Sequence, residues 1–267
     1  MPYFTTNDNC RLFYTLTEPS PHAPAVIFLN GLAQTTTYWH GQARFFAEDY
    51  RILRYDGRAQ GRSEIGAEPL TPPRHVSDLR ALCDHLEIES ANLVGLSHGA
   101  YVALAYTARY PGSVDRLVVC NLRAGRYGGS EIVARWLRKL KQEGLASYAR
   151  DVIQAATGKT FRNTHAHLIP MMAKAVAARN SQAGLVRQVE AMQAYQPASQ
   201  IAPRVRIPSL VINGGEDEIV PAADAGILAR SLQAATATIA AAGHSLPVEA
   251  PEDFNLLVRD FLNPDVA

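Results

Sequence analysis

Short apolar runs, most of them rich in β-branched residues, recur along the chain. They cover residues 25–29, 50–55, 91–96, 116–121 and 209–213. A strand that is solvated on one face alternates apolar and polar residues, whereas a parallel strand covered on both faces is almost continuously apolar. Most of these runs are of the second kind, so they predict buried parallel strands.

Helical patterns lie between these runs. Residues 76–86 and 100–110 repeat apolar side chains at the spacing of an amphipathic helix. The order strand, helix, strand, helix predicts an α/β fold with a mostly parallel, doubly wound sheet and right-handed crossovers.

The alternation stops after Asn121 and resumes near Pro208. The intervening sequence has helical periodicity, interrupted by Gly144, Gly158, Pro170 and Gly184. We therefore expect a core made of residues 1–124 and 201–267, with a helical cap of residues 125–200 inserted between them. Such an insertion lies above the carboxyl edge of the sheet, where ligands bind in open α/β folds. A second helical layer without function is the alternative interpretation.

The predicted cap contains several large apolar side chains that could line a substrate pocket. Helical apolar residues pack into cores more often than they line pockets, so the sequence does not rank these candidates. They are Trp136, Leu140, Met171, Met172 and Met192.

Composition and charge exclude several classes of partner. The 267 residues carry a formal net charge of +1, which favours neither nucleic acid nor an anionic membrane surface. No apolar run approaches the roughly 20 residues that span a bilayer, and the N-terminus lacks a signal-peptide pattern. Cys10, Cys83 and Cys120 lie too far apart for a CxxC metal or redox motif. We expect a cytoplasmic protein without membrane insertion, metal or cofactor, acting on a small molecule.

The segment Gly95-Leu96-Ser97-His98-Gly99 joins a predicted strand to a predicted helix. The pattern G-x-S-x-G alone would occur by chance in about one chain in ten of this length. Its position between strand and helix is typical of a turn that projects a serine hydroxyl above the sheet edge. Ser97 is therefore the candidate nucleophile.

A serine hydroxyl at neutral pH requires a general base and a group that orients the base. Asp217 follows the strand at 209–213, and His244 follows a later apolar stretch. The order Ser97, Asp217, His244 predicts a nucleophilic triad. Position favours His244 as the base, and a shorter side chain favours Asp217 as the acid. Competing bases are His40, His75 and His98, and competing acids are Glu216 and Glu218. Glu249 is expected to be structural, supporting the last helix.

Acyl transfer also requires donors for a developing oxyanion. The backbone N–H of His98 opens the helix after Ser97, where unpaired amides favour negative charge. Gly31 permits a sharp turn that aims the backbone N–H of Leu32 into the same site. Asn30 and Gly31 are candidate substrate contacts, although Asn-Gly is also a common turn dipeptide.

The segment from Asp56 to Ser63 is rich in loop-forming residues. It has neither the Walker lysine nor the dinucleotide G-x-G-x-x-G spacing, so we expect a structural turn and no nucleotide cofactor.

With these motifs, the chain resembles the α/β-hydrolase superfamily from about residue 10 onward. The matching segments are LNGLAQTTTYW, RYDGRAQGRSE, VGLSHGAYVALAYTARYP, INGGEDEIVP and GHSLPVEAPEDF. The resemblance implies the α/β-hydrolase fold, but it is weakly specific for substrate. Many relatives carry His-Gly in place of Asn30-Gly31, which puts the side-chain contacts of the oxyanion loop in doubt. They also carry Gly-Gly in place of Gly99-Ala100, which is a mild difference.

Two groups of the superfamily look most similar. RILRYDGRAQGRS and GLSHG resemble the 3-oxoadipate enol-lactonases, whereas Asn30-Gly31 with the following TTT and ATGK (156–159) resemble bacterial 3-hydroxyacyl transferases. We favour hydrolysis of a small carboxylic ester, lactone or thioester through an acyl-enzyme. Transfer of a 3-hydroxyacyl group is the alternative, and a non-catalytic small-molecule sensor is a third hypothesis.

Overall fold

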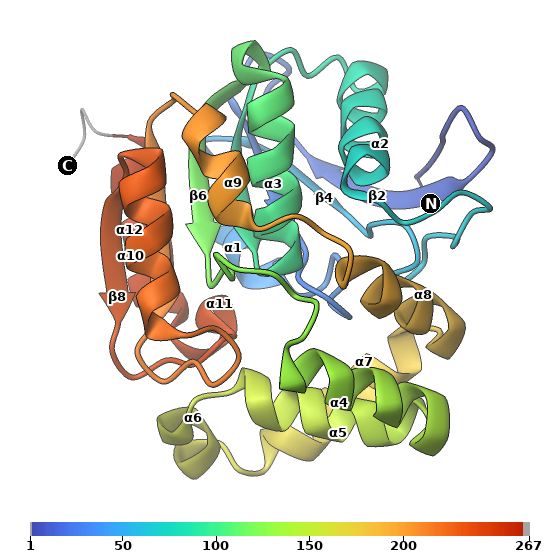
Figure 1. The fold of residues 1–267 in the computed structure, drawn as a ribbon. Coiled ribbons are helices and arrows are strands. Elements are labelled where there is room, and N and C mark those ends of the chain that lie inside the picture. The colour runs from blue at the N-terminus through green and yellow to red at the C-terminus, as the bar shows by residue number, and fades with distance from the viewer. Residues whose placement is uncertain (1, 264–267) are drawn as a thin grey trace.

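The computed structural model describes residues 2–263, which form one eight-stranded sheet flanked by helices (Figure 1). The strand order is β1-β2-β4-β3-β5-β6-β7-β8, and all neighbours are parallel except β1 with β2 and β2 with β4. The strands are β1 (Tyr3–Thr5), β2 (Arg11–Thr17), β3 (Ala25–Leu29), β4 (Arg51–Tyr55), β5 (Ala91–Leu96), β6 (Val114–Cys120), β7 (Ser209–Gly214) and β8 (Ala235–Ile239).

The five predicted strands are β3 to β7, and β3 and β5 have the predicted bounds. The sequence pattern did not reveal β1, β2 or β8. β8 is a mostly exposed edge strand of alanine and threonine, and β1 and β2 form an antiparallel margin of the sheet. Because edge strands are covered less completely, they lack the continuous apolar pattern of the central strands.

Helices cover both faces of the sheet (Figure 1). Helices α1 and α12 pack together on one face, while α2, α3 and α10 cover the other. The helices are α1 (His40–Phe46), α2 (Pro72–His85), α3 (His98–Arg109), α4 (Glu131–Arg138), α5 (Leu145–Ala156), α6 (Lys159–Thr164), α7 (Leu168–Arg179), α8 (Gln182–Met192), α9 (Ala198–Ile201), α10 (Ala222–Leu232), α11 (Leu246–Glu249) and α12 (Pro251–Leu262). A π-helical turn, Lys139–Glu143, extends α4, and 3₁₀ turns lie at Pro111–Ser113 and Ala202–Arg204.

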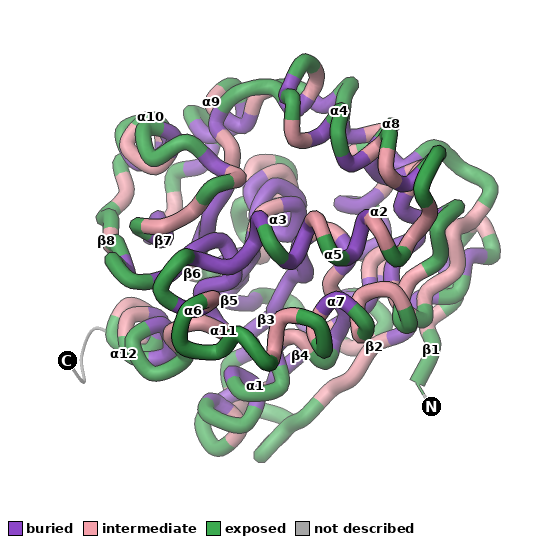
Figure 2. The backbone as a smooth tube through the Cα atoms, turned by 90° about the horizontal axis from the view of Figure 1, so that it is seen from below, coloured by how far each residue is buried: buried purple, intermediate pink, exposed green. Residues whose placement is uncertain are grey.

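The central strands contribute side chains to two cores. Along β3, Val26 and Phe28 pack with Trp39 toward α1 and α12, whereas Ile27 and Leu29 join the core under α2 and α3. Figure 2 shows the central strands buried and much of the outer helical surface exposed. Burial on both faces explains the continuously apolar sequence of these strands.

Five helices, α4 to α8, lie beyond the carboxyl ends of the parallel strands (Figure 1). Residues 131–192 contain no strand, as their helical periodicity predicted. The chain then returns to the sheet through α9, which packs against α3 and α10. Among residues 2–263, no helix is long and apolar enough to cross a membrane.

Candidate active site

Ser97 occupies a sharp turn between β5 and α3. Its backbone has φ +54° and ψ −116°, a conformation that is unfavourable for a residue with a side chain. The Ser97 N–H donates to the carbonyl of Cys120 over 2.9 Å. A Cβ atom on Gly99 would collide with the Leu29 carbonyl, so this position requires glycine for α3 to approach β3. The turn therefore presents the serine at the carboxyl edge of the sheet.

His244 and Asp217 form a buried hydrogen-bonded pair. His244 Nδ1 lies 2.8 Å from Asp217 Oδ2, and both side chains are more than nine-tenths buried. The second oxygen, Asp217 Oδ1, accepts hydrogen bonds from the N–H groups of Ile219 at 2.7 Å and Val220 at 3.1 Å. These contacts fix the carboxylate, which in turn places the proton of a neutral imidazole on Nδ1 and leaves Nε2 as an acceptor.

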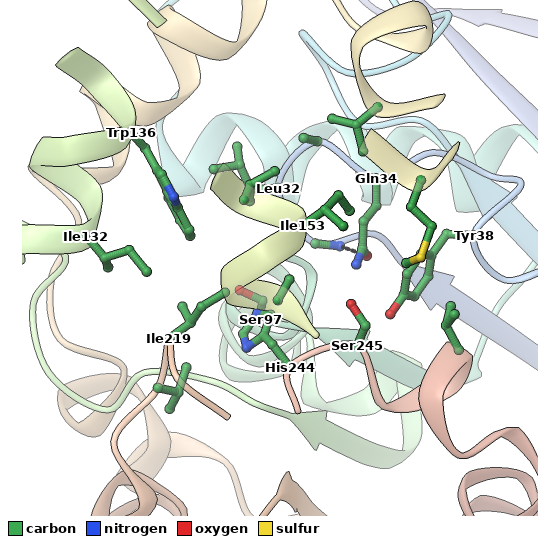
Figure 3. Close-up of a pocket in the computed structure, with 18 of the residues that line it drawn as sticks. Leu32, Gln34, Tyr38, Ser97, Ile132, Trp136, Ile153, Ile219, His244 and Ser245 are labelled. Atoms are coloured by element: carbon green, nitrogen blue, oxygen red, sulfur yellow. Dashed lines mark hydrogen bonds between the residues drawn. The ribbon is translucent and has the colours of Figure 1, made fainter. Parts of the chain in front are cut away.

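Ser97 and His244 line the same pocket, and Figure 3 draws their side chains next to each other. Asp217 does not line this pocket, so it lies behind the imidazole. Within the described part of the chain, the Ser97 hydroxyl makes no hydrogen bond to His244. Contacts of this kind are often loose in unliganded enzymes and tighten when substrate binds.

The other two carboxylates of the Asp217 loop bind the helical segment instead. Glu216 accepts hydrogen bonds from the backbone N–H and hydroxyl of Thr160 at 2.7 and 2.6 Å. Glu218 forms an ion pair with Arg162 at 2.7 Å. Neither carboxylate contacts His244, so the geometry favours Asp217 among the three acids.

Two unpaired backbone N–H groups lie near Ser97 along the chain or in the pocket wall: that of His98, which follows it directly, and that of Leu32. The N–H groups of Leu32 and His98 have no hydrogen-bond partner among residues 2–263, and Leu32 and Ser97 line the same pocket. Gly31 fixes the first loop, because its N–H donates to Gln34 Oε1 at 2.7 Å and its carbonyl accepts from Gln60 Nε2 at 3.1 Å. This arrangement leaves both N–H groups available for an anionic oxygen.

Asn30 was predicted to contact the substrate, but it lies outside the pocket. It does not line the pocket, because its buried side chain points away and donates from Nδ2 to the Tyr55 carbonyl at 2.8 Å. Gly31, its neighbour, does line the pocket. Asn30 is therefore a structural residue of this loop.

None of the competing histidines lines the pocket. His40 is exposed at the start of α1. His75 and His98 are buried together behind the Ser97 turn, with ring centroids 5.0 Å apart, and His98 Nε2 lies 3.2 Å from Gln188 Nε2. Burial lowers the pKa of His98 to about 4 and that of His75 well below its usual value. Both imidazoles are therefore neutral at physiological pH.

Asn121, which is not among the predicted site residues, ties the His244 loop to the sheet. Asn121, just after β6, donates from Nδ2 to the carbonyls of Gly243 at 3.2 Å and His244 at 2.9 Å. Its Oδ1 accepts from the Gly214 N–H at 3.0 Å. Asn121 has φ +45°, a conformation that asparagine tolerates better than most residues. An asparagine at the end of a strand was the available signal.

Glu249 supports His244 rather than the last helix. Its carboxylate accepts hydrogen bonds from the N–H groups of Gly158, Gly243 and Ser245 at 2.7 to 2.9 Å. Burial raises the pKa of Glu249, while these donors oppose the shift. The carboxylate thus joins the His244 loop to the turn between α5 and α6.

The segment after β4 is a structural turn that supports the loop at Gly31. Asp56 is buried and accepts hydrogen bonds from the N–H groups of Thr36 at 2.6 Å and Arg62 at 3.0 Å. Arg58, also buried, pairs with Asp8 and Asp78 at 2.7 Å each. The hydrogen bonds and ion pairs of Asp56 and Arg58 are therefore made to other residues of the protein and stabilise the turn.

The pocket has a volume of about 250 Å³ and lies between the strand ends and the helical segment. Of the predicted apolar candidates, Trp136, Met172 and Met192 line it. Leu140 is buried elsewhere, and Met171 is 63% exposed. Across the described residues, no cluster of histidine, cysteine and carboxylate side chains could hold a metal ion.

The fold agrees with the comparisons to known proteins. Residues 24–251 match the family described as alpha/beta hydrolase fold. The chain belongs to this family and is an α/β-hydrolase enzyme.

Individual relatives are distant but cover most of the chain. It is 26% identical to 3-oxoadipate enol-lactonase 2 of Acinetobacter baylyi, over 88% of this chain and 87% of the relative. It is 29% identical to the putative carbamate hydrolase RutD of Caulobacter sp. (strain K31), over 93% and 94%. The enol-lactonase structure from Burkholderia xenovorans LB400 superposes with a TM-score of 0.90 at 28% identity, over 98% of this chain and 100% of that one. The chain therefore resembles the enol-lactonase group.

Proposed function

We propose that this enzyme hydrolyses a small carboxylic ester, lactone or thioester through a covalent acyl intermediate on Ser97. One observation carries the proposal: Ser97 lines a single pocket together with His244, whose imidazole is held from behind by the buried Asp217, and the backbone N–H groups of Leu32 and His98 are unpaired among the described residues. This set supplies a nucleophile, a base, an orienting acid and oxyanion donors.

In the acylation step, Ser97 Oγ attacks the substrate carbonyl while His244 Nε2 accepts its proton. Asp217 holds the imidazole in this tautomer and stabilises the imidazolium that forms. The carbonyl oxygen becomes negatively charged and accepts hydrogen bonds from the N–H groups of Leu32 and His98. The imidazolium then protonates the leaving group as its bond to the acyl carbon breaks.

In the deacylation step, His244 removes a proton from water, which attacks the Ser97 ester. The same backbone N–H groups stabilise the second oxyanion, and the proton returns to Ser97 as the acid leaves. No cofactor is needed in this sequence. The apolar character of most of the pocket wall suits a short hydrocarbon or ring skeleton.

We also propose that residues 125–200 act as a cap over the substrate. The support is that α4, α5, α7 and α8 all contribute residues to the pocket wall, with Trp136 from α4 and Ile153 from α5. Enclosure of this kind excludes bulk water from the reacting carbonyl.

A cytoplasmic location is part of the same proposal. Cys10, Cys83 and Cys120 are buried free thiols. Unpaired thiols are typical of a reducing compartment.

A serine-reactive fluorophosphonate probe tests the nucleophile. We expect stoichiometric labelling of the wild-type enzyme, no labelling of Ser97→Ala, and much slower labelling of His244→Gln. A Ser130→Ala variant is the matched control, because Ser130 also lines the pocket. A folded wild-type protein that resists the probe and turns over no ester would support a sensor instead.

A further inference from the structure

Three polar side chains gather on one wall of the mostly apolar pocket. Gln34 and Tyr38 come from the loop before α1, and Ser245 follows His244. Figure 3 shows the polar ends of these three side chains pointing toward one another beside Ser97 and His244. The proposed reaction uses none of these groups.

Tyr38 contributes a hydroxyl that lacks a partner. Its oxygen is shielded from solvent and makes no hydrogen bond within residues 2–263. Burial raises the pKa of Tyr38 well above its usual value, and the side chains that could bond its hydroxyl are Ser245 and Gln34. An unsatisfied buried hydroxyl is destabilising, so a ligand that supplies an acceptor has a specific advantage here.

Gln34 and Ser245 add further donors on the same wall. Because Gln34 Oε1 already accepts the Gly31 N–H at 2.7 Å, the amide Nε2 must face another partner, and it has none among the described residues. The Ser245 hydroxyl is equally unpaired there, although its backbone N–H donates to Glu249 Oε1 at 2.9 Å. Three side chains thus present hydrogen-bond donors to one region of the pocket.

The charges around this wall favour a neutral ligand group. The Glu249 carboxylate lies behind Ser245 and acts electrostatically on Tyr38, so a second anion beside Tyr38 would be repelled. The two arginines that line the pocket donate hydrogen bonds within the fold: Arg179 to Thr37 Oγ1 at 2.8 Å, and Arg123 to the Arg126 carbonyl at 2.8 Å. The group that fits is a neutral acceptor oxygen rather than a carboxylate.

We propose that Tyr38, Ser245 and Gln34 form a polar subsite that binds a neutral oxygen of the substrate, such as a ketone, ether or hydroxyl oxygen, near the scissile carbonyl. The subsite rests on the proposed function, because it defines which esters the Ser97 site selects. It favours oxygenated substrates over hydrocarbon analogues of equal length.

Matched substrates test this selection. The acyl pair is 4-nitrophenyl 4-oxopentanoate and 4-nitrophenyl pentanoate, and the alcohol pair is the 2-methoxyethyl and butyl esters of one acid. The readout is the ratio of kcat/KM within each pair, which compares substrates of similar length. We expect Tyr38→Phe to lower this ratio about tenfold for at least one pair, the loss of one neutral hydrogen bond. Ser245→Ala should lower it in the same pair.

Tyr127→Phe is the control, because Tyr127 also lines the pocket with an unpaired hydroxyl but lies outside the three-residue wall. We expect its ratios to stay within twofold of wild type. Unchanged ratios in both Tyr38→Phe and Ser245→Ala, or an equal change in Tyr127→Phe, would overturn the subsite.

Binding separates this proposal from the catalytic one. In Ser97→Ala, which cannot form the ester, the oxo ester should bind more tightly than pentanoate, and Tyr38→Phe should remove the difference. Equal binding of the two esters would overturn the subsite. If the binding preference is present but Ser97 of the wild-type enzyme forms no ester with either substrate, the proposed hydrolysis is contradicted and the subsite is not.

Discussion

Asn121 donates a hydrogen bond from its side-chain Nδ2 to the carbonyl oxygen of His244 over 2.9 Å. The same side chain accepts the N–H of Gly214, at the end of the strand that precedes Asp217. One amide thus links the loop that carries His244 to the strand end that precedes Asp217. Asn121 is a positioning residue for the pair.

Asn121→Gly removes this link without adding strain, because glycine adopts the positive φ of this position freely. We expect kcat to fall about ten- to hundredfold with little change in KM, since the altered geometry affects the reacting groups and not the pocket. Steady-state kinetics with a nitrophenyl ester measure both constants. Asn213→Ala is the control, because among residues 2–263 the Asn213 side chain only accepts a hydrogen bond from the exposed Thr238 hydroxyl, at 3.1 Å. A kcat within twofold of wild type would contradict the positioning role.

Asp217→Asn should lower turnover by roughly 10⁴-fold, because the amide favours the wrong imidazole tautomer. Glu216→Gln and Glu218→Gln should each change kcat by less than about threefold, since both carboxylates make exposed contacts to α6. Comparison of kcat for the three folded variants tests the assignment. If either glutamine variant lost activity while Asp217→Asn stayed near wild type, the acid would be misassigned.

Acid should destabilise the enzyme through the buried histidines behind Ser97. Burial lowers the pKa of His98 from 6.5 to about 4, so the unfolded chain binds a proton before the folded one. The contribution of the neutral, buried His98 to the free energy of unfolding is complete above about pH 6.5 and is lost as the pH falls toward 4. We expect about 2 kcal/mol less stability from His98 at pH 5 than at pH 7.5, with His75 acting in the same direction.

Urea unfolding at the two pH values measures this effect. His98→Gln should depend less on pH than wild type, and it keeps the backbone N–H of residue 98. An equal pH dependence in both proteins would show that His98 does not couple to stability.

Trp136 should limit the length of the acyl chain, because it is a large buried side chain in the pocket wall. In Trp136→Ala, the ratio of kcat/KM for nitrophenyl octanoate to that for acetate should rise several-fold. Leu140→Ala is the control, since Leu140 is buried outside the pocket and its truncation costs about 2–5 kcal/mol of stability. A similar shift in Leu140→Ala would mean that general loosening, not pocket space, sets the preference.

The sequence predicts the central sheet well, because strands that are buried on two faces, such as β3 and β5, consist almost entirely of apolar residues. It also indicates Ser97, Asp217 and His244 as candidate site residues, since each follows a strand or an apolar stretch, and the structure brings Asp217 within 2.8 Å of His244. It does not reveal β8, because the mostly exposed alanines and threonines of this strand do not form a continuous apolar run.

Contacts that join distant segments are also absent from the local pattern. Nothing around Asn121 indicates its bond to His244, and nothing places Tyr38 beside Ser245. The sequence also does not reveal that the Asn30 side chain donates to the Tyr55 carbonyl, because a loop position does not fix where a side chain points. These relationships exist only once the fold is formed.

Mass spectrometry of the enzyme, quenched with acid during its first turnover of a nitrophenyl ester, tests for the Ser97 acyl-enzyme. We expect the peptide containing Ser97 to gain the mass of the acyl group and the adduct to decay at the rate of deacylation. His244→Gln should accumulate it far more slowly. An enzyme that hydrolyses the ester with no acyl adduct, or with the adduct on another residue, would contradict the central claim.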